Sequence, residues 1–128
     1  MQNEVITLTR ELVAIPSETA NSNAAIADFL QRWLESRDFT LERVSYRDAN
    51  EEEKINLIAK RGEGKGGLGF FSHSDTVPGD PREWDPFDPI IQDNKLVGRG
   101  SCDMKGGLAR ITSAYSFQRS WLVRLSYS

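Results

Sequence analysis

The stretch GFFSHSDTVPGD, residues 69–80, contains the only histidine of the chain, His73, two positions before Asp75. On an extended segment, side chains two residues apart point to the same side, and neighbouring side chains point to the other. A Ser-His-Asp triad with Ser72 or Ser74 is therefore sterically unfavourable. A neutral imidazole is a common metal ligand, and a nearby carboxylate orients its ring. The pair predicts half of a metal site; the alternative is a hydrogen-bonded surface pair.

A further candidate, Asp103, lies inside GRGSCDMKGG, where glycines on both sides permit tight backbone geometry and leave a small carboxylate accessible. The alternative is that Asp103 caps the helix that follows it. Cys102 is interpreted as a small buried side chain rather than a zinc thiolate, because it is the only cysteine.

The elements that must position these residues follow from the hydrophobic pattern. A period of three to four predicts a helix from Val5 to Ile15, which Pro16 ends, and a second helix up to Asp38. Asn21, Ser22 or Asn23 is expected to cap the second helix. The second helix has an apolar stripe of Ile26, Phe29, Leu30, Trp33 and Leu34.

Alternation then predicts a strand over 39–46, where a change of parity indicates a slip or bulge, and another over 55–60. The glycine-rich stretch RGEGKGG is expected to form a hairpin turn, since its spacing does not fit a phosphate loop. Residues 68–71 are expected to be a strand buried on both faces. His73 and Asp75 would lie at or just past its C-terminal end.

Residues 76–94 contain four of the five prolines and are expected to be irregular, with Trp84 and Phe87 as anchors. A short strand over 95–97 and a helix with apolar positions Leu108, Ile111 and Tyr115 complete the chain. This succession predicts an α/β fold with a mixed sheet and flanking helices.

Composition limits the classes of function. The chain has 128 residues, 38% hydrophobic and 27% charged, with a formal net charge of −3. This balance favours a small-molecule partner and argues against nucleic acid and membrane surfaces. No apolar run approaches the roughly 20 residues of a membrane span, and a single cysteine with no signal-peptide pattern predicts a cytoplasmic protein.

The strings FSHSDTVPGD, EWDPFDP and NKLVGRGSCDMKGGLA closely resemble the M20 metallopeptidase and deacylase family, the group of acetylornithine deacetylase, succinyl-diaminopimelate desuccinylase and carboxypeptidase G2. The similarity runs in order from about Leu12 to about Ala109. The resemblance implies that residues 1–109 are the N-terminal part of a catalytic domain of the zinc-peptidase type.

The resemblance also implies roles for the candidate residues. His73 would bind one metal, Asp75 would hold the imidazole, and Asp103 would bridge two metals, followed by a cis peptide bond. Trp84 and Phe87 would be scaffold. The cofactor would be two Zn²⁺ or Co²⁺ ions, which polarise a substrate amide and activate a water. The substrate would be an N-acyl amino acid or peptide, cleaved to an amine and a carboxylate. Members of the family are often homodimers.

The family's further ligands are two adjacent glutamates, one of them the general base, another carboxylate and a late histidine. After Asp103 the chain has no Asp, Glu or His. Residues 110–128 form an atypical basic and serine-rich tail, which suggests truncation or a frameshift; the alternative is a domain that borrows ligands from a second chain. An incomplete sheet would also make the protein poorly soluble.

Two hypotheses follow from these observations. The first is a metal-dependent amide hydrolase that is inactive, or nearly so, as this chain alone. The second is a non-catalytic binding module whose contact surface is the basic tail, with Trp121, Leu122 and Leu125.

Overall fold

The computed structural model describes residues 2–116 and 121–125 of the chain. Two helices come first, α1 (Gln2–Ala14) and α2 (Ala24–Glu35), followed by strands β1 (Thr40–Arg47), β2 (Glu53–Arg61) and β3 (Gly69–Ser72). A small hairpin of β4 (Ile90–Gln92) and β5 (Lys95–Val97) leads to a turn, η1 (Ser101–Lys105). Helix α3 (Gly106–Ser116) and strand β6 (Trp121–Leu125) end the described chain. The predicted α/β fold with a mixed sheet is confirmed.

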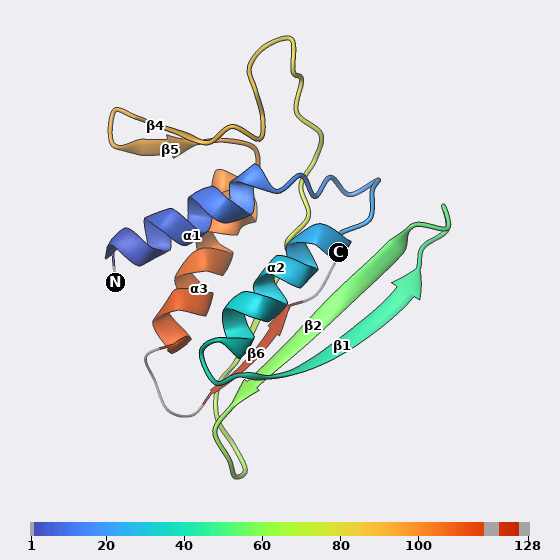
Figure 1. Ribbon diagram of the computed structural model, residues 1–128, viewed down its shortest axis with the longest axis vertical. Coiled ribbons are helices and arrows are strands. Elements are labelled where there is room, and N and C mark those ends of the chain that lie inside the picture. Colours follow the sequence, from blue (N-terminus) through green and yellow to red (C-terminus); the bar gives the residue numbers. More distant parts are fainter. Residues whose placement is uncertain (1, 117–120, 126–128) are drawn as a thin grey trace.

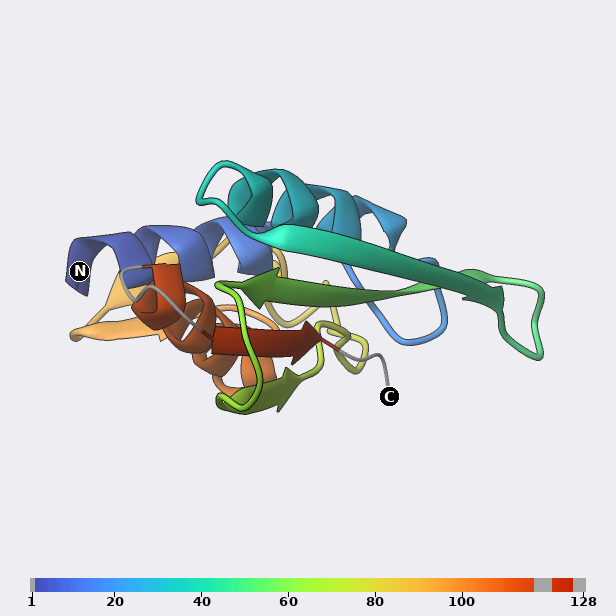
Figure 2. The same ribbon diagram turned by 90° about the horizontal axis from the view of Figure 1, so that it is seen from below.

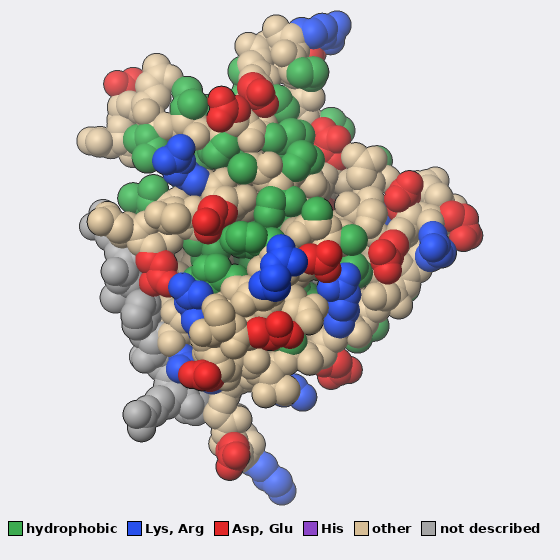
Figure 3. Space-filling model, viewed as in Figure 1, with side chains coloured by type: hydrophobic (Ala, Val, Ile, Leu, Met, Phe, Trp, Pro, Cys, Tyr) green, Lys and Arg blue, Asp and Glu red, His purple; other side chains and the backbone are tan. Residues whose placement is uncertain are grey.

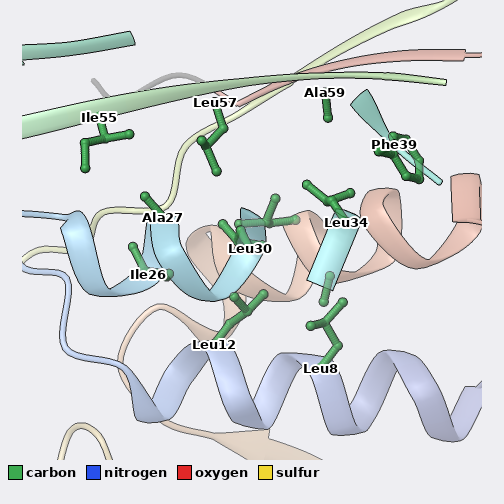
Figure 4. Packing of buried hydrophobic residues seen from close by; sticks show 12 residues of the cluster. Leu8, Leu12, Ile26, Ala27, Leu30, Leu34, Phe39, Ile55, Leu57 and Ala59 are labelled. Carbon is green, nitrogen blue, oxygen red and sulfur yellow. The ribbon is translucent and has the colours of Figure 1, made fainter. Parts of the chain in front are cut away.

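The main sheet has the strand order β1-β2-β6-β3, and β6 is antiparallel to β2 but parallel to β3. The helices cover one face of this sheet (Figures 1 and 2). Figure 4 shows α2 between β2 and α1, with side chains from all three elements meeting in one cluster. The core thus binds α1 to the sheet through α2.

The core follows the predicted periodicity. Leu8 and Leu12 of α1 meet Leu30 and Leu34 of α2, and all four are essentially inaccessible to solvent. The alternate residues Ile55, Leu57 and Ala59 of β2 face the same cluster, which Phe39, Ile26, Ala27, Leu108 and Ala109 complete. A helical stripe and a half-buried strand are what these two patterns predict.

The predicted cap of α2 is only partly right. Asn23 occupies the cap position, but its side chain makes no capping hydrogen bond, whereas the hydroxyl of Ser22 accepts from the N–H of Ala24, the first helical residue, at 3.2 Å. The amide group of Asn23 instead donates to Ile55 O at 2.9 Å and accepts from Ile55 N at 2.8 Å. Asn23 therefore ties the α1–α2 loop, residues 15–23, to strand β2 as a neighbouring strand would.

Two predictions for the sheet are wrong. Strand β1 has no bulge, since its register with β2 is continuous from Thr40↔Lys60 to Arg47↔Glu53. The change of parity reflects apolar side chains on both faces: Leu41 packs on the core, whereas Val44 and Tyr46 are exposed. The stretch RGEGKGG does not close a hairpin either, because β6 separates β2 from β3.

Strand β3 is also less buried than expected. Phe70 packs on Tyr115 of α3 with ring centroids 4.4 Å apart, but Phe71, on the opposite face, is 65% exposed. The reason is that β3 is an edge strand of the described sheet and has helices on one face only. By contrast, the strand over 95–97 is as predicted. The stretch 76–94 was expected to be irregular throughout, which holds for residues 76–89 but not for residues 90–92, which form strand β4.

The predicted division at residue 109 falls inside α3, which continues to Ser116, and β6 occupies an interior position in the sheet. That residues 110–128 are foreign to the rest of the chain stays a prediction. None of the helices in the described part of the chain is long and apolar enough to cross a membrane. On the face shown in Figure 3, acidic and basic side chains are interspersed around apolar ones.

Candidate metal centre

The segment that carries His73 continues from the end of β3 and is fixed by the α1–α2 loop. Thr76 N donates to Ser17 O at 2.9 Å, and Thr19 N donates to Thr76 O at 2.9 Å. The hydroxyl of Ser17 also donates to Ser74 O at 2.7 Å. These bonds form a short parallel bridge between the loop and the segment. Backbone pairing therefore sets the position of the two predicted residues His73 and Asp75.

The imidazole of His73 lies between two carboxylates. Its Nδ1 is 3.3 Å from Asp75 Oδ1 and 3.2 Å from the backbone oxygen of the same residue, and its Nε2 is 3.1 Å from Asp103 Oδ1. The side chain of Asp75 is only 6% exposed, that of His73 29% and that of Asp103 88%. The structure therefore brings together all three predicted site residues, with one carboxylate buried behind the ring and the other open to solvent.

Asp103 lies in a segment where the backbone turns sharply. Gly100, at the start of η1, has φ +79°, and the peptide bond from Asp103 to Met104 is cis, as the family resemblance implied. Asp103 itself has φ −120° and ψ 97°. Its carboxylate makes no hydrogen bond to a backbone N–H of the described residues, so the alternative of a helix cap is wrong. Cys102 is exposed, not buried as predicted.

The three residues line a pocket of about 520 Å³ together with Thr19, Thr76, Val77 and residues 98–102. Arg99 is the only basic residue among those that line it. Its guanidinium carbon lies 5.5 Å from the ring centroid of the half-buried Trp84. The pocket is large enough for a small polar molecule next to the histidine and the exposed carboxylate.

Two buried lysines, which sequence reasoning missed, hold the α1–α2 loop. Lys105, the last residue of η1, is fully buried and donates from Nζ to Ile15 O at 2.8 Å. Burial lowers its pKa to about 8. Lys54 of β2 is 1% exposed and donates from Nζ to Thr19 O at 2.8 Å and to Asn21 O at 2.6 Å.

Only one of these lysines had a signal in the sequence. Lys105 lies within the glycine-flanked motif that contains Asp103, which marks it as part of a special local structure. Lys54 stands at the end of an acidic stretch and reads as a solvated charge. Its burial arises from contacts with a loop more than thirty residues away.

His73 and Asp103 fit two positions in the ligand shell of one metal ion. Two ligands of a tetrahedral zinc ion, each bonded at about 2.0–2.1 Å, lie about 3.3 Å apart. The distance between His73 Nε2 and Asp103 Oδ1 is 3.1 Å. No group of three or more His, Cys, Asp or Glu side chains able to hold a metal occurs among the described residues. The described chain thus offers part of a metal site.

Comparisons with known proteins agree with this picture. Residues 69–122 match the model of peptidase family M20/M25/M40. The chain is 40% identical over 117 residues to acetylornithine deacetylase of Proteus mirabilis, covering 85% of this chain and 30% of that protein. It is 40% identical over 119 residues to succinyl-diaminopimelate desuccinylase of Ehrlichia canis, covering 91% and 31%. The chain spans about 30% of the length of these curated relatives.

Solved structures confirm the fold. The di-peptidase Dug1p from Saccharomyces cerevisiae superposes with a TM-score of 0.77 at 16% identity, covering 98% of this chain and 32% of that one. Human carnosine dipeptidase 1 gives a TM-score of 0.72 at 23% identity, covering 97% and 31%. The fold of the described residues is therefore that of part of such a peptidase domain, and the sequence over residues 69–122 is similar to peptidase family M20/M25/M40.

Proposed function

We propose that the chain contributes one side of a metal centre in a hydrolase that cleaves the amide bond of N-acyl amino acids or peptides. The observation that carries this proposal is the contact between His73 Nε2 and Asp103 Oδ1, two residues that line a pocket together with Asp75. The two curated relatives described above are named for the removal of acetyl and succinyl groups. Their names support this substrate class.

In this proposal each residue has a distinct role. His73 would hold one ion through Nε2, because Asp75 can accept the hydrogen of Nδ1 and so leave the Nε2 lone pair available. Asp103 would help to hold the ions through its exposed carboxylate. When bound, Zn²⁺ or Co²⁺ polarises the amide carbonyl and lowers the pKa of a water. The products are a free amine and a carboxylate.

This set of residues is too small for catalysis by the chain alone. A catalytic zinc ion takes about three protein ligands, and two ions need more. The chain has no acidic residue or histidine after Asp103. We expect weak metal binding and no hydrolysis beyond background from the 128-residue chain. We also propose that it acts in the cytoplasm on small molecules rather than on nucleic acid or membranes, in keeping with its net charge of −3. Homodimer formation stays a prediction.

The alternative of a non-catalytic binding module relies on Trp121, Leu122 and Leu125. Their side chains lie outside the described residues, and the backbone of β6 pairs with strands on both sides. No observation in the described chain favours this second function.

Titration of the full chain with Co²⁺, followed by absorption and by NMR of the single imidazole, tests the proposed site. We expect weak binding that His73→Ala and Asp103→Asn each lower by at least about tenfold, since each variant removes a ligand. Asp93→Asn, in the exposed β4–β5 turn, is the matched control and keeps the wild-type affinity. Binding that is insensitive to Asp103→Asn, or tight binding of two ions by the monomer, would overturn the proposal.

A further inference from the structure

Both oxygens of the buried Asp75 carboxylate are engaged. Oδ1 lies 3.3 Å from His73 Nδ1, which also lies 3.2 Å from the backbone carbonyl oxygen of Asp75. Oδ2 accepts a hydrogen bond of 2.8 Å from the hydroxyl of Thr19, which also lies 3.2 Å from Thr76 O. A carboxylate held at one oxygen can still rotate and present the other oxygen or neither. The Thr19 hydroxyl thus constrains the face that Asp75 presents to the imidazole.

Thr19 is itself fixed through its backbone. Its N–H donates to Thr76 O at 2.9 Å, and its carbonyl accepts from Lys54 Nζ at 2.8 Å. Lys54 also binds Asn21 O, at 2.6 Å, and forms an ion pair of 3.4 Å with Asp48. Thr19 is exposed, but its backbone is fixed by hydrogen bonds to Thr76 and Lys54, and this limits where its hydroxyl can lie.

The start of the same loop is held by the other buried cation. Lys105 Nζ donates to Ile15 O at 2.8 Å, and Lys105 follows the proposed ligand Asp103 by two residues. The loop is thus attached at one end to the turn that carries Asp103 and in its middle to strand β2. This arrangement links the position of Thr19 to both halves of the proposed site.

We propose that Thr19 is a positioning residue for the metal ligand His73. Its hydroxyl orients Asp75 so that the carboxylate oxygen Oδ1 joins the backbone oxygen of Asp75 as an acceptor for the hydrogen of His73 Nδ1. The imidazole then keeps the Nε2 lone pair for the metal. The competing carboxylate, Asp103, is 88% exposed, so water weakens its hold on the ring more than that of the buried Asp75. The metal part of this inference rests on the proposed function, whereas the effect on the imidazole proton does not.

The test compares Thr19→Val and Thr19→Ala, which remove the hydroxyl, with Thr19→Ser, which keeps it. Because the chain has a single histidine, a nitrogen–proton correlation spectrum reports the tautomer of His73 without overlap. We expect the population with the proton on Nδ1 to fall in the Val and Ala variants and to return in the Ser variant. Co²⁺ affinity should fall by about 3- to 10-fold and recover in parallel, a smaller effect than the loss of Asp75 itself.

Thr7→Val is the matched control, since Thr7 is an exposed threonine of α1 away from the pocket, and it keeps the wild-type spectrum. An unchanged imidazole spectrum in both Thr19→Val and Thr19→Ala overturns the inference, as does a spectrum that Thr19→Ser fails to restore. If the wild-type chain binds no Co²⁺, the proposed function fails, and the tautomer measurement still decides the role of Thr19.

Discussion

At the scale of single residues, the most unusual group is the buried ammonium of Lys105. Burial disfavours its charged form and lowers its pKa to about 8 from the ordinary lysine value of 10.5. Its hydrogen bond to Ile15 O offsets part of this penalty, and no acidic side chain of the described residues lies within 4 Å of Nζ. Lys105 is therefore a source of pH-dependent stability.

We expect the free energy of unfolding to rise with pH between about 8 and 10.5 because of this residue. In that range the unfolded chain holds a proton on Lys105 that the folded chain has released, so raising the pH favours the folded state. The full gain is about 3 kcal/mol. Urea denaturation at a series of pH values measures it.

Lys105→Met is the control for this prediction, because it keeps an unbranched chain of similar length without the titrating group. The difference in unfolding free energy between wild type and variant should change across the interval from pH 8 to 10.5. Parallel curves for the two proteins would show that Lys105 does not titrate as described.

The three predicted site residues illustrate what single residues reveal in a sequence. His73, Asp75 and Asp103 were identifiable because they lie in recognisable motifs with glycine or proline nearby, one of which contains the only histidine of the chain. Thr19 had no such pattern. Its role depends on a hydrogen bond to a residue 56 positions away, and only the folded loop creates that contact.

At the scale of elements, the turn that presents Asp103 depends on Gly100. Its φ of +79° lies in the left-handed region, and a Cβ there would overlap the methyl group of Thr76. Thr76 follows Asp75 directly, so a displacement would reach the carboxylate behind His73. The glycine is thus required for both backbone conformation and close approach.

We expect Gly100→Ala to lower the free energy of unfolding by about 2 kcal/mol or more, since it adds backbone strain to a steric overlap. Gly107→Ala is the matched control. It lies in α3, where a Cβ makes only an ordinary contact with Met104, and alanine is the better helix former by up to about 1 kcal/mol. Equal urea midpoints for the two variants would contradict the role assigned to Gly100.

Hydrophobic periodicity predicts single helices and strands but not the order of strands in a sheet. The stripes that end at Ile15 and Leu34 correctly predicted α1 and α2, because a helix buries a face defined by its own sequence. Strand order is not local in this sense. Nothing in RGEGKGG indicates that a third strand lies between its flanking strands, and the hairpin prediction failed for that reason.

At the scale of the whole molecule, the helices leave one face of the described sheet uncovered (Figure 2). Phe71 of β3 is 65% exposed, and Val44 and Tyr46 of β1 are 41% and 43% exposed. Apolar side chains on an open sheet face favour association between molecules. This exposure is in keeping with the predicted poor solubility.

We expect the purified chain to bind a hydrophobic dye and to self-associate in sedimentation velocity, and Phe71→Ser to reduce both. The urea midpoint should change little, because the side chain of Phe71 is mostly exposed to solvent. Phe70→Ser, one residue earlier, should instead lower the midpoint, since Phe70 packs on Tyr115. Dye binding that is the same in wild type and Phe71→Ser would contradict the assignment of Phe71 to the surface through which the molecules associate.

The position of β6 has a consequence for the order in which the molecule is built. During synthesis the N-terminal segments emerge first, so α1, α2 and the β1–β2 hairpin are complete long before residues 121–125 exist. Strand β3 has no neighbour in the described sheet other than β6, to which it pairs in parallel across about fifty residues of chain. Such distant parallel pairings form slowly. Strand β3, which leads to His73, therefore has no partner in the described sheet until residues 121–125 have been synthesised.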